Sequence, residues 1–125
     1  MQLTLIPLQQ TLAVCKLEFG ASLPSWAVAG WFSITRTNDE LSIVCPQEAV
    51  PANVTCQRGW RGLRVAGTMP FSMVGVLASL AVLLAEAGIS LFALSTFDTD
   101  YVLVQDQDFG KALDALRRHG HTIIA

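Results

Sequence analysis

Residues 92–104 read FALSTFDTDYVLV, and this stretch determines the fold that the sequence predicts. Two apolar segments flank a polar centre at residues 95–100, which is the pattern of two β-strands joined by a tight turn. A shift of 60 residues aligns the stretch, without a gap, with FSITRTNDELSIV at residues 32–44. Phe32 and Val44 are identical to their counterparts, and both windows predict a hairpin. The chain therefore looks like a duplicated unit.

The elements around the later hairpin complete a known pattern. A strand is predicted over residues 63–66, and an apolar helix follows that begins after Ser72 as N-cap and ends before Gly88. Beyond the hairpin, the periodicity predicts a helix over residues 109–119 and a strand over residues 121–124. The order strand, helix, strand, strand, helix, strand is the ferredoxin-like βαββαβ plait.

The earlier copy follows the same order with shorter helices. Strands are predicted over residues 11–17 and 55–61, and short helical segments over residues 24–29 and 47–50. We therefore predict an α+β chain of two tandem ferredoxin-like βαββαβ units. The expected boundaries are a degenerate unit over residues 1–61 and a second unit over residues 62–125.

Composition limits the classes of partner. Charged residues make up 14% of the chain, against about 25% in soluble domains, while apolar residues make up 52%, which excludes a disordered chain. The net charge of −2 offers no footprint for nucleic acid or anionic lipid. Three tryptophans and nearby arginines have the composition of a stacking platform for single-stranded nucleic acid, but core or interface packing fits the acidic balance better.

The sequence also predicts a cytoplasmic location. Cys15, Cys45 and Cys56 are odd in number and form no C-x-x-C pair, so they indicate neither a disulfide framework nor a zinc site. The first residues lack the basic region of a secretory signal. Residues 65–85 carry no charge, but Pro70 would break a single helix there, so a buried helix fits better than a membrane span.

Candidates for catalysis are few. The histidines, His119 and His121, lie at the C-terminal edge, away from any expected nucleophile, and no glycine-rich phosphate loop occurs. Asp98 and Asp100 are close enough in sequence to share a cation, yet no third hard ligand is fixed near them. We expect no catalytic residue, no metal and no cofactor.

A small-molecule cleft is the more informative possibility. The loop at residues 68–74 leads into the amino end of the apolar helix, where free N–H groups favour a carboxylate. The polar turn at residues 95–100 is expected beside it and offers hydroxyls and carboxylates. A free amino acid carries both charges that such a cleft satisfies. An ordinary capped helix beside a polar turn fits the same residues and stays open.

Three segments resemble the ACT domain family, and more closely its tandem CASTOR-like subgroup of arginine sensors. They are GVLA at residues 75–78, LAEAGIS at residues 84–90 and, most specifically, STFDTDYVLV at residues 95–104. The resemblance covers residues 62–120. It implies tandem ferredoxin-like units, pairing of units within or between chains, amino-acid sensing at interfaces, and no catalytic residue.

The resemblance also implies site residues. Thr96, Phe97 and Asp100 are similar to turn positions that line the ligand in the arginine sensors, and Asp100 would meet a cationic group. The expected ligand-binding set is Ser72, Val74, Ser95, Thr96, Phe97, Asp98 and Asp100. The corresponding turn of the first copy, residues 36–40, departs from the pattern, so a second equivalent site stays open.

The leading hypothesis is a non-catalytic regulatory protein that binds an amino acid and forms a homodimer. Two rivals remain. One is a structural interaction or oligomerisation module without a ligand, and the other is an enzyme of amino-acid metabolism, which would need a base or metal that the sequence does not supply.

Overall fold

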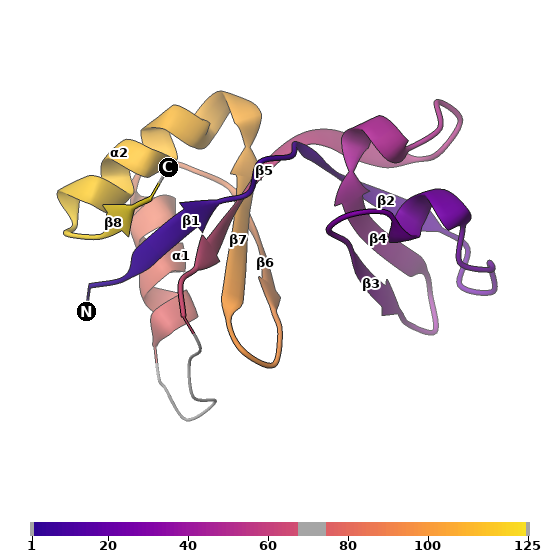
Figure 1. The fold of residues 1–125 in the computed structure, drawn as a ribbon, viewed down its shortest axis with the longest axis horizontal. Helices are drawn as coiled ribbons and strands as arrows, with labels where there is room; N and C mark the ends of the chain where they lie inside the picture. The colour runs from indigo at the N-terminus through magenta and orange to yellow at the C-terminus, as the bar shows by residue number, and fades with distance from the viewer. Residues whose placement is uncertain (1, 68–74, 125) are drawn as a thin grey trace. The chain divides into compact units, whose positions relative to one another are not determined.

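The computed structural model describes residues 2–67 and 75–124 (Figure 1). The chain folds as two compact units: the first unit is Gln10–Trp60, and the second unit is Met1–Gln9 together with Arg61–Ala125. The sequence-based division at residues 61 and 62 is therefore wrong for the first nine residues, which belong to the second unit. Strand β5 (Cys56–Val65) runs through the division, where two separate strands were expected.

The first unit is an antiparallel sheet with two short helical turns. The order of its strands in the sheet is β3-β4-β2-β5, the neighbour order of the expected plait. Single turns of 3₁₀-helix, η1 and η2, occupy the two helix positions. Besides the start of β5, its elements are β2 (Leu12–Leu17), η1 (Ser25–Val28), β3 (Ser33–Arg36), β4 (Leu41–Pro46) and η2 (Gln47–Ala49).

The described residues of the second unit form a five-stranded sheet and two α-helices. Its strand order is β8-β1-β5-β7-β6. The hairpin of β6 and β7 and the helix α2 confirm the elements expected from periodicity. Besides the end of β5, its elements are β1 (Thr4–Pro7), α1 (Val76–Glu86), β6 (Leu91–Ser95), β7 (Asp100–Gln105), η3 (Asp106–Asp108), α2 (Phe109–Arg118) and β8 (Thr122–Ile123).

Strand β1 is the main departure from the predicted plait, in which β8 would lie directly beside β5. Instead β1 lies between them, with Leu5 opposite Val65 in an antiparallel pair and opposite Ile123 in a parallel pair. The N–H of Leu8 donates to the carbonyl of Gly62 at 2.8 Å. A Cβ on Gly62 would lie 2.6 Å from Leu8 Cδ1, so a larger residue there would force the Leu8 side chain to move.

The core of the second unit lies between the sheet and the two helices. Leu80 and Leu84 of α1 and Leu116 of α2 pack with Leu5 and Val102 of the sheet, and all five are buried. On the face of α1 that points away from this core, Val82 is 56% exposed. No helix in residues 2–67 and 75–124 is long and apolar enough to span a membrane.

The start of α1 differs from the expected one. The helix begins at Val76, directly after Gly75, whose φ of +82° lies in the left-handed region that glycine tolerates best. The N–H of Ser79 donates to the Gly75 carbonyl at 2.8 Å, which closes the first turn. The predicted N-cap, Ser72, lies outside the described residues.

A histidine accepts a hydrogen bond from the backbone just before strand β1. The N–H of Leu3 donates to Nδ1 of His121 at 3.0 Å, and the histidine is buried. Because Nδ1 accepts this bond, the ring must be neutral, with its proton on Nε2. Burial lowers the pKa of His121 from its ordinary value of 6.5.

The position of β1 predicts that shortening one of its buried side chains lowers the stability of the protein strongly. Leu5→Ala removes buried methyl groups from the centre of the sheet and should lower the free energy of unfolding by about 2–4 kcal/mol. Ile124→Ala, at an exposed position directly after the neighbouring strand β8, should lower it by less than about 1 kcal/mol. Urea denaturation measures both. Equal effects of the two substitutions would contradict the placement of β1.

The bond to His121 predicts a pH dependence of stability. The lowered pKa means that the unfolded chain takes up a proton more readily than the folded chain. Stability is therefore complete above about pH 6.5 and falls as the pH drops through that value toward the folded pKa. In His121→Asn, the side-chain oxygen can accept from the N–H of Leu3 without titrating. This variant should therefore lose the fall in stability with decreasing pH that His121 causes. Denaturation near neutral pH and at about pH 5, with His119→Asn as the control, tests it.

Candidate functional site

The turn between β6 and β7 is stabilised by its own side chains. The N–H of Thr96 donates to the carbonyl of Thr99 at 2.8 Å, and the N–H of Thr99 donates to Thr96 Oγ1 at 3.2 Å. At the mouth of the turn, the hydroxyl of Ser95 donates to the Asp100 carboxylate at 2.6 Å. The turn is thus ordered without help from a ligand.

Thr99 attaches this turn to the neighbouring strand. Its hydroxyl donates to the carbonyl of Val65 at 2.6 Å, and the residue is only 7% exposed. Val65 is the last residue of β5, which leads toward residues 68–74. The turn therefore lies at the end of β5 from which the chain leaves for α1. The predicted cleft depends on this placement of the turn.

The expected ligand-binding residues fall into two groups. Ser95, Thr96, Phe97, Asp98 and Asp100 share the one turn, where Phe97 is 79% exposed and Asp100 is partly buried. The other two, on the expected facing loop, lie outside the described residues. They are Ser72 and Val74. The structure therefore brings together the turn half of the site and leaves the loop half as a prediction.

The structure adds one residue to this group. Thr99 was not a candidate in the sequence, because it lies in a turn where the alternation of a strand is interrupted and burial has no periodic signal. Its role is to position the turn, since its hydroxyl bonds to the backbone of β5.

A separate concavity lies outside α1 in the second unit. It has a volume of about 570 Å³ and is formed by one face of α1 and the C-terminal end of α2. The residues that define its character are Val82, Glu86, His119 and His121. Its apolar floor and exposed rim suit contact with another surface more than the enclosure of a small molecule.

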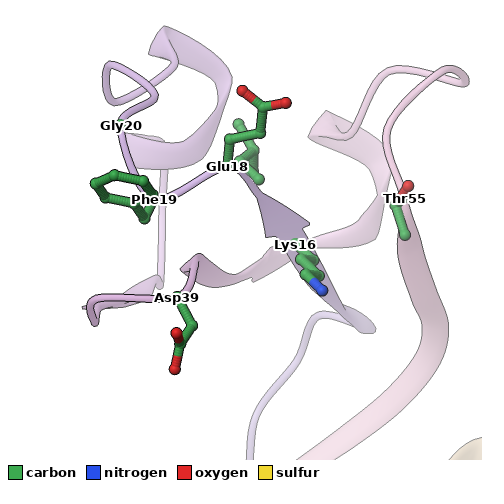
Figure 2. Close-up of a pocket in the computed structure, with 7 residues that line it drawn as sticks. Lys16, Glu18, Phe19, Gly20, Asp39 and Thr55 are labelled. Atoms are coloured by element: carbon green, nitrogen blue, oxygen red, sulfur yellow. The ribbon is translucent and has the colours of Figure 1, made fainter.

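The first unit has a concavity of similar volume, about 570 Å³, at the end of β2 (Figure 2). Lys16, Glu18 and Asp39 line it, and their charged groups point in different directions rather than toward one another. Arg36 holds one wall by donating to the carbonyls of Phe19 and Ala21. The surface is open and mixed in charge, and it lies at the hairpin turn that departs from the pattern of the later copy.

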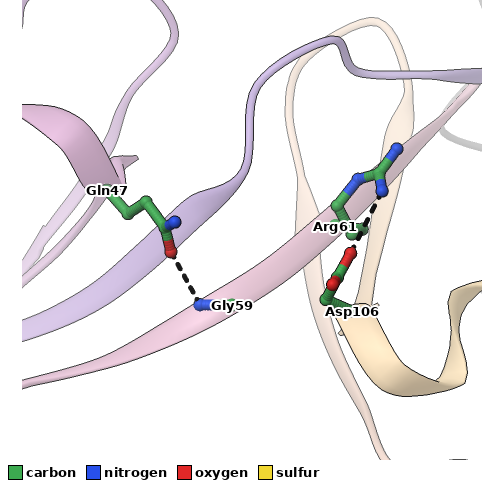
Figure 3. A network of polar contacts seen from close by, with 4 residues as sticks. All are labelled: Gln47, Gly59, Arg61 and Asp106. Atoms are coloured by element: carbon green, nitrogen blue, oxygen red, sulfur yellow. Dashed lines mark hydrogen bonds and ion pairs between the residues drawn. The ribbon is translucent and has the colours of Figure 1, made fainter.

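Two arginines of β5, Arg58 and Arg61, make internal contacts. Arg61 pairs with Asp106 at 3.1 Å (Figure 3), and its guanidinium lies 4.0 Å from the centre of the Phe109 ring. In the first unit, Arg58 donates to the carbonyls of Gln47, at the start of η2, and of Val50, directly after it. Beside it, the side chain of Gln47 accepts from the N–H of Gly59 at 2.9 Å (Figure 3). Arg58 and Arg61 are thus engaged in holding each unit, in agreement with packing rather than a nucleic-acid platform.

Trp60 supports the same interpretation, because it is 6% exposed and cannot present a face for base stacking. Within residues 2–67 and 75–124, no three histidine, cysteine, aspartate or glutamate side chains are grouped so that they could hold a metal ion.

Comparison with known proteins identifies two regions. A model of the ACT domain matches residues 55–118, and a separate model of an N-terminal domain matches residues 10–53. The human cytosolic arginine sensor for mTORC1 subunit 1 is 30% identical over 109 residues, which cover 81% of this chain. The mouse protein of the same name is 29% identical over 129 residues. The chain spans 33% of the human protein and 39% of the mouse protein.

Two solved structures are similar to this chain. Protein Atu0741 from Agobacterium tumefaciens is 35% identical, with a TM-score of 0.93 over 99% of this chain and 93% of that one. The regulatory subunit of aspartate kinase from Thermus flavus shares the fold, with a TM-score of 0.63 at 10% identity over 91% of this chain and 95% of that one.

The ACT model covers more than half of the sequence, and the hairpin, the two α-helices and the polar turn of the second unit all fall within the matched region or at its border. The chain therefore belongs to the ACT domain family.

Proposed function

We propose that this protein is a non-catalytic regulatory protein that binds a free amino acid at the turn formed by residues 95–100, as a cytoplasmic homodimer. Membership of the ACT family supports a regulatory role. The human and mouse relatives are named cytosolic arginine sensors, which favours an amino acid with a cationic side chain as the ligand.

The observation that carries this proposal is the bond from Thr99 to Val65. It fixes a turn that bears the Asp100 carboxylate at the end of β5, beside the point where the chain departs for α1. A carboxylate held by Ser95 can accept from the ammonium or guanidinium group of a ligand. Ser72 and Val74 would complete the site from the loop that follows β5.

The two units fit a tandem arrangement of ACT-like modules. The strand order of the first unit matches that of the plait, although 3₁₀ turns replace both helices. A separate family model matches residues 10–53, which is consistent with a diverged copy. We assign the ligand site to the second unit, because the corresponding turn of the first unit lacks the same residues.

Regulation by such a protein requires differential binding. A ligand shifts an equilibrium between two arrangements only by the difference between its affinities for them. The chain carries no catalytic group that this proposal uses, so the response would pass to a separate target or between copies of the chain.

The proposal predicts selective stabilisation by an amino acid. Among the free amino acids, one with a cationic side chain should raise the thermal midpoint, and at 100 times its Kd it should add about 2.7 kcal/mol of stability. Asp100→Asn removes the charge and should weaken binding by about 10-fold or more. Asp114→Asn, an exposed site on α2 with the same change in charge, should bind as the wild type does.

Thermal shift identifies the ligand, and calorimetric titration gives the affinities. If no amino acid binds, the sensor proposal fails. If the Asp100 and Asp114 variants bind equally well, the ligand lies elsewhere.

The positioning role of Thr99 predicts a separate effect. Thr99→Val keeps the shape of the side chain and leaves the Val65 carbonyl without its donor, so stability should fall by about 1–3 kcal/mol and ligand affinity should fall with it. Thr99→Ser keeps the hydroxyl and should restore ligand affinity. Calorimetry on the three proteins, at a temperature where all are folded, measures this. Unchanged affinity in the valine variant would separate the turn from the ligand site.

An oligomerisation module without a ligand is the second candidate. The exposed Val82 on α1, flanked on the same helix by the exposed Ala78 and Ala85, favours it. This alternative requires oligomers that persist whether or not an amino acid is added, and that dissociate on Val82→Asp. Light scattering with and without ligand distinguishes the two.

A further inference from the structure

The three cysteines gather in the core of the first unit. Cys15 and Cys45 are 1% and 0% exposed, and Cys56 is partly exposed at the start of β5. All three belong to or pack against one apolar cluster. All three thiols are free.

The register of β2 and β5 sets two of these cysteines face to face. Cys15 lies directly opposite Cys56 in an antiparallel pair. The N–H of Lys16 donates to the carbonyl of Thr55 at 3.0 Å, so the next pair along the ladder is the hydrogen-bonded one. Hydrogen-bonded and non-hydrogen-bonded pairs alternate in antiparallel sheets, and the Cα atoms of the second kind are only about 4.5 Å apart. Cys15 and Cys56 form a pair of this close kind.

This spacing permits a disulfide, since bridged cysteines have Cα atoms about 4.4–6.8 Å apart. Side chains of directly opposite residues also project from the same face of the sheet. Cys45 and Cys56 both lie near the Cys15 thiol, and the two neighbours add to the raised pKa of Cys15; the sheet register decides which of them faces it directly.

Cys45 occupies a different position relative to Cys15. On β4 the residue opposite Cys15 is Ile43, which makes Cys45 a diagonal neighbour. Diagonal neighbours have Cα atoms about 7–8 Å apart, beyond the span of a disulfide. Cys45 therefore supplies a matched control: the same residue type, in the same core, with an unsuitable backbone.

We propose that Cys15 and Cys56 are a redox-responsive pair, which a hydroperoxide oxidant converts into a cross-strand disulfide between β2 and β5. The thiolate of Cys56 attacks the peroxide, which forms a sulfenic acid and releases one water molecule from hydrogen peroxide. The sulfur of Cys15 then attacks the Cys56 sulfur, and the sulfenic oxygen leaves as a second water. Two thiols are oxidised by two electrons, and one peroxide is reduced to two waters.

The order of these steps follows from exposure. Burial raises the pKa of Cys15 to about 12 and also raises the pKa of Cys45, so neither offers a thiolate near neutral pH. Cys56 is the partly exposed member and meets the oxidant first. Cys15 then acts only as the resolving thiol, over a distance that the sheet has already fixed.

The expected consequence is a stabilised first unit. The disulfide would close a loop that runs from β2 through the β3–β4 hairpin to β5, and closing a loop of this length restricts the unfolded chain substantially. The thermal midpoint should rise by about 5 °C or more on oxidation. A reducing thiol such as dithiothreitol should reverse the change.

The test uses the full chain, reduced and then treated with hydrogen peroxide under folding conditions. The intact mass should fall by the mass of two hydrogen atoms, and proteolysis without reduction should yield one linked pair of peptides, containing Cys15 and Cys56. Cys45→Ser should retain the loss of mass and the rise of the midpoint. Cys56→Ser, at the partly exposed position, should fold and lose both.

Three results would overturn the proposal. One is a linked peptide that contains Cys45. Another is oxidation of Cys56 to a sulfinic acid without any crosslink. The third is full alkylation of all three thiols, measured in denaturant after the peroxide treatment. None of these readouts depends on amino-acid binding, so the redox pair and the proposed sensor function stand or fall separately.

Discussion

The pairing of β1 with both β5 and β8 is the constraint on which the second unit depends. Leu5 has a backbone partner on each side, at Val65 and at Ile123, and its side chain is buried in the core that α1 and α2 cover. β1 is antiparallel to β5 and parallel to β8. Strand β8 therefore keeps the direction that the plait requires, but it is separated from β5 by one strand. The first residues of the chain thereby fix the last ones.

Local patterns predicted most elements, and long-range pairing explains the exceptions. The two hairpins and α2 follow from contiguous alternation, helical spacing and end signals, all of which lie within one segment. The place of β1 depends instead on contacts such as the bond from Leu3 to His121, which are 118 residues apart in sequence. A four-residue apolar segment carries no signal of such a partner. The observed α1 also starts later than expected, at Val76, because Gly75 before it adopts a left-handed conformation.

The polar character of the turn was predictable from the sequence, and its attachment to the sheet was less so. Hydroxyl and carboxylate residues between two apolar strands indicated a polar turn, and Ser95 and Asp100 do meet there. Thr99 could not be foreseen, because its bond to Val65 joins residues 34 apart across a strand pairing that composition does not reveal. The close cysteine pair was equally hidden: spacing along the chain argued against a disulfide framework, while the register of β2 and β5 sets Cys15 and Cys56 opposite one another.

The internal bonds of the turn bear on how binding could produce a response. A loop that must be ordered by its ligand spends part of the binding free energy on that ordering. Here the backbone bonds between Thr96 and Thr99 and the attachment to β5 already hold the turn. Binding at such a turn leaves more free energy to act on an equilibrium elsewhere, between copies of the chain or between the chain and its target. An effector has to bias such an equilibrium through a difference between its affinities for the two states.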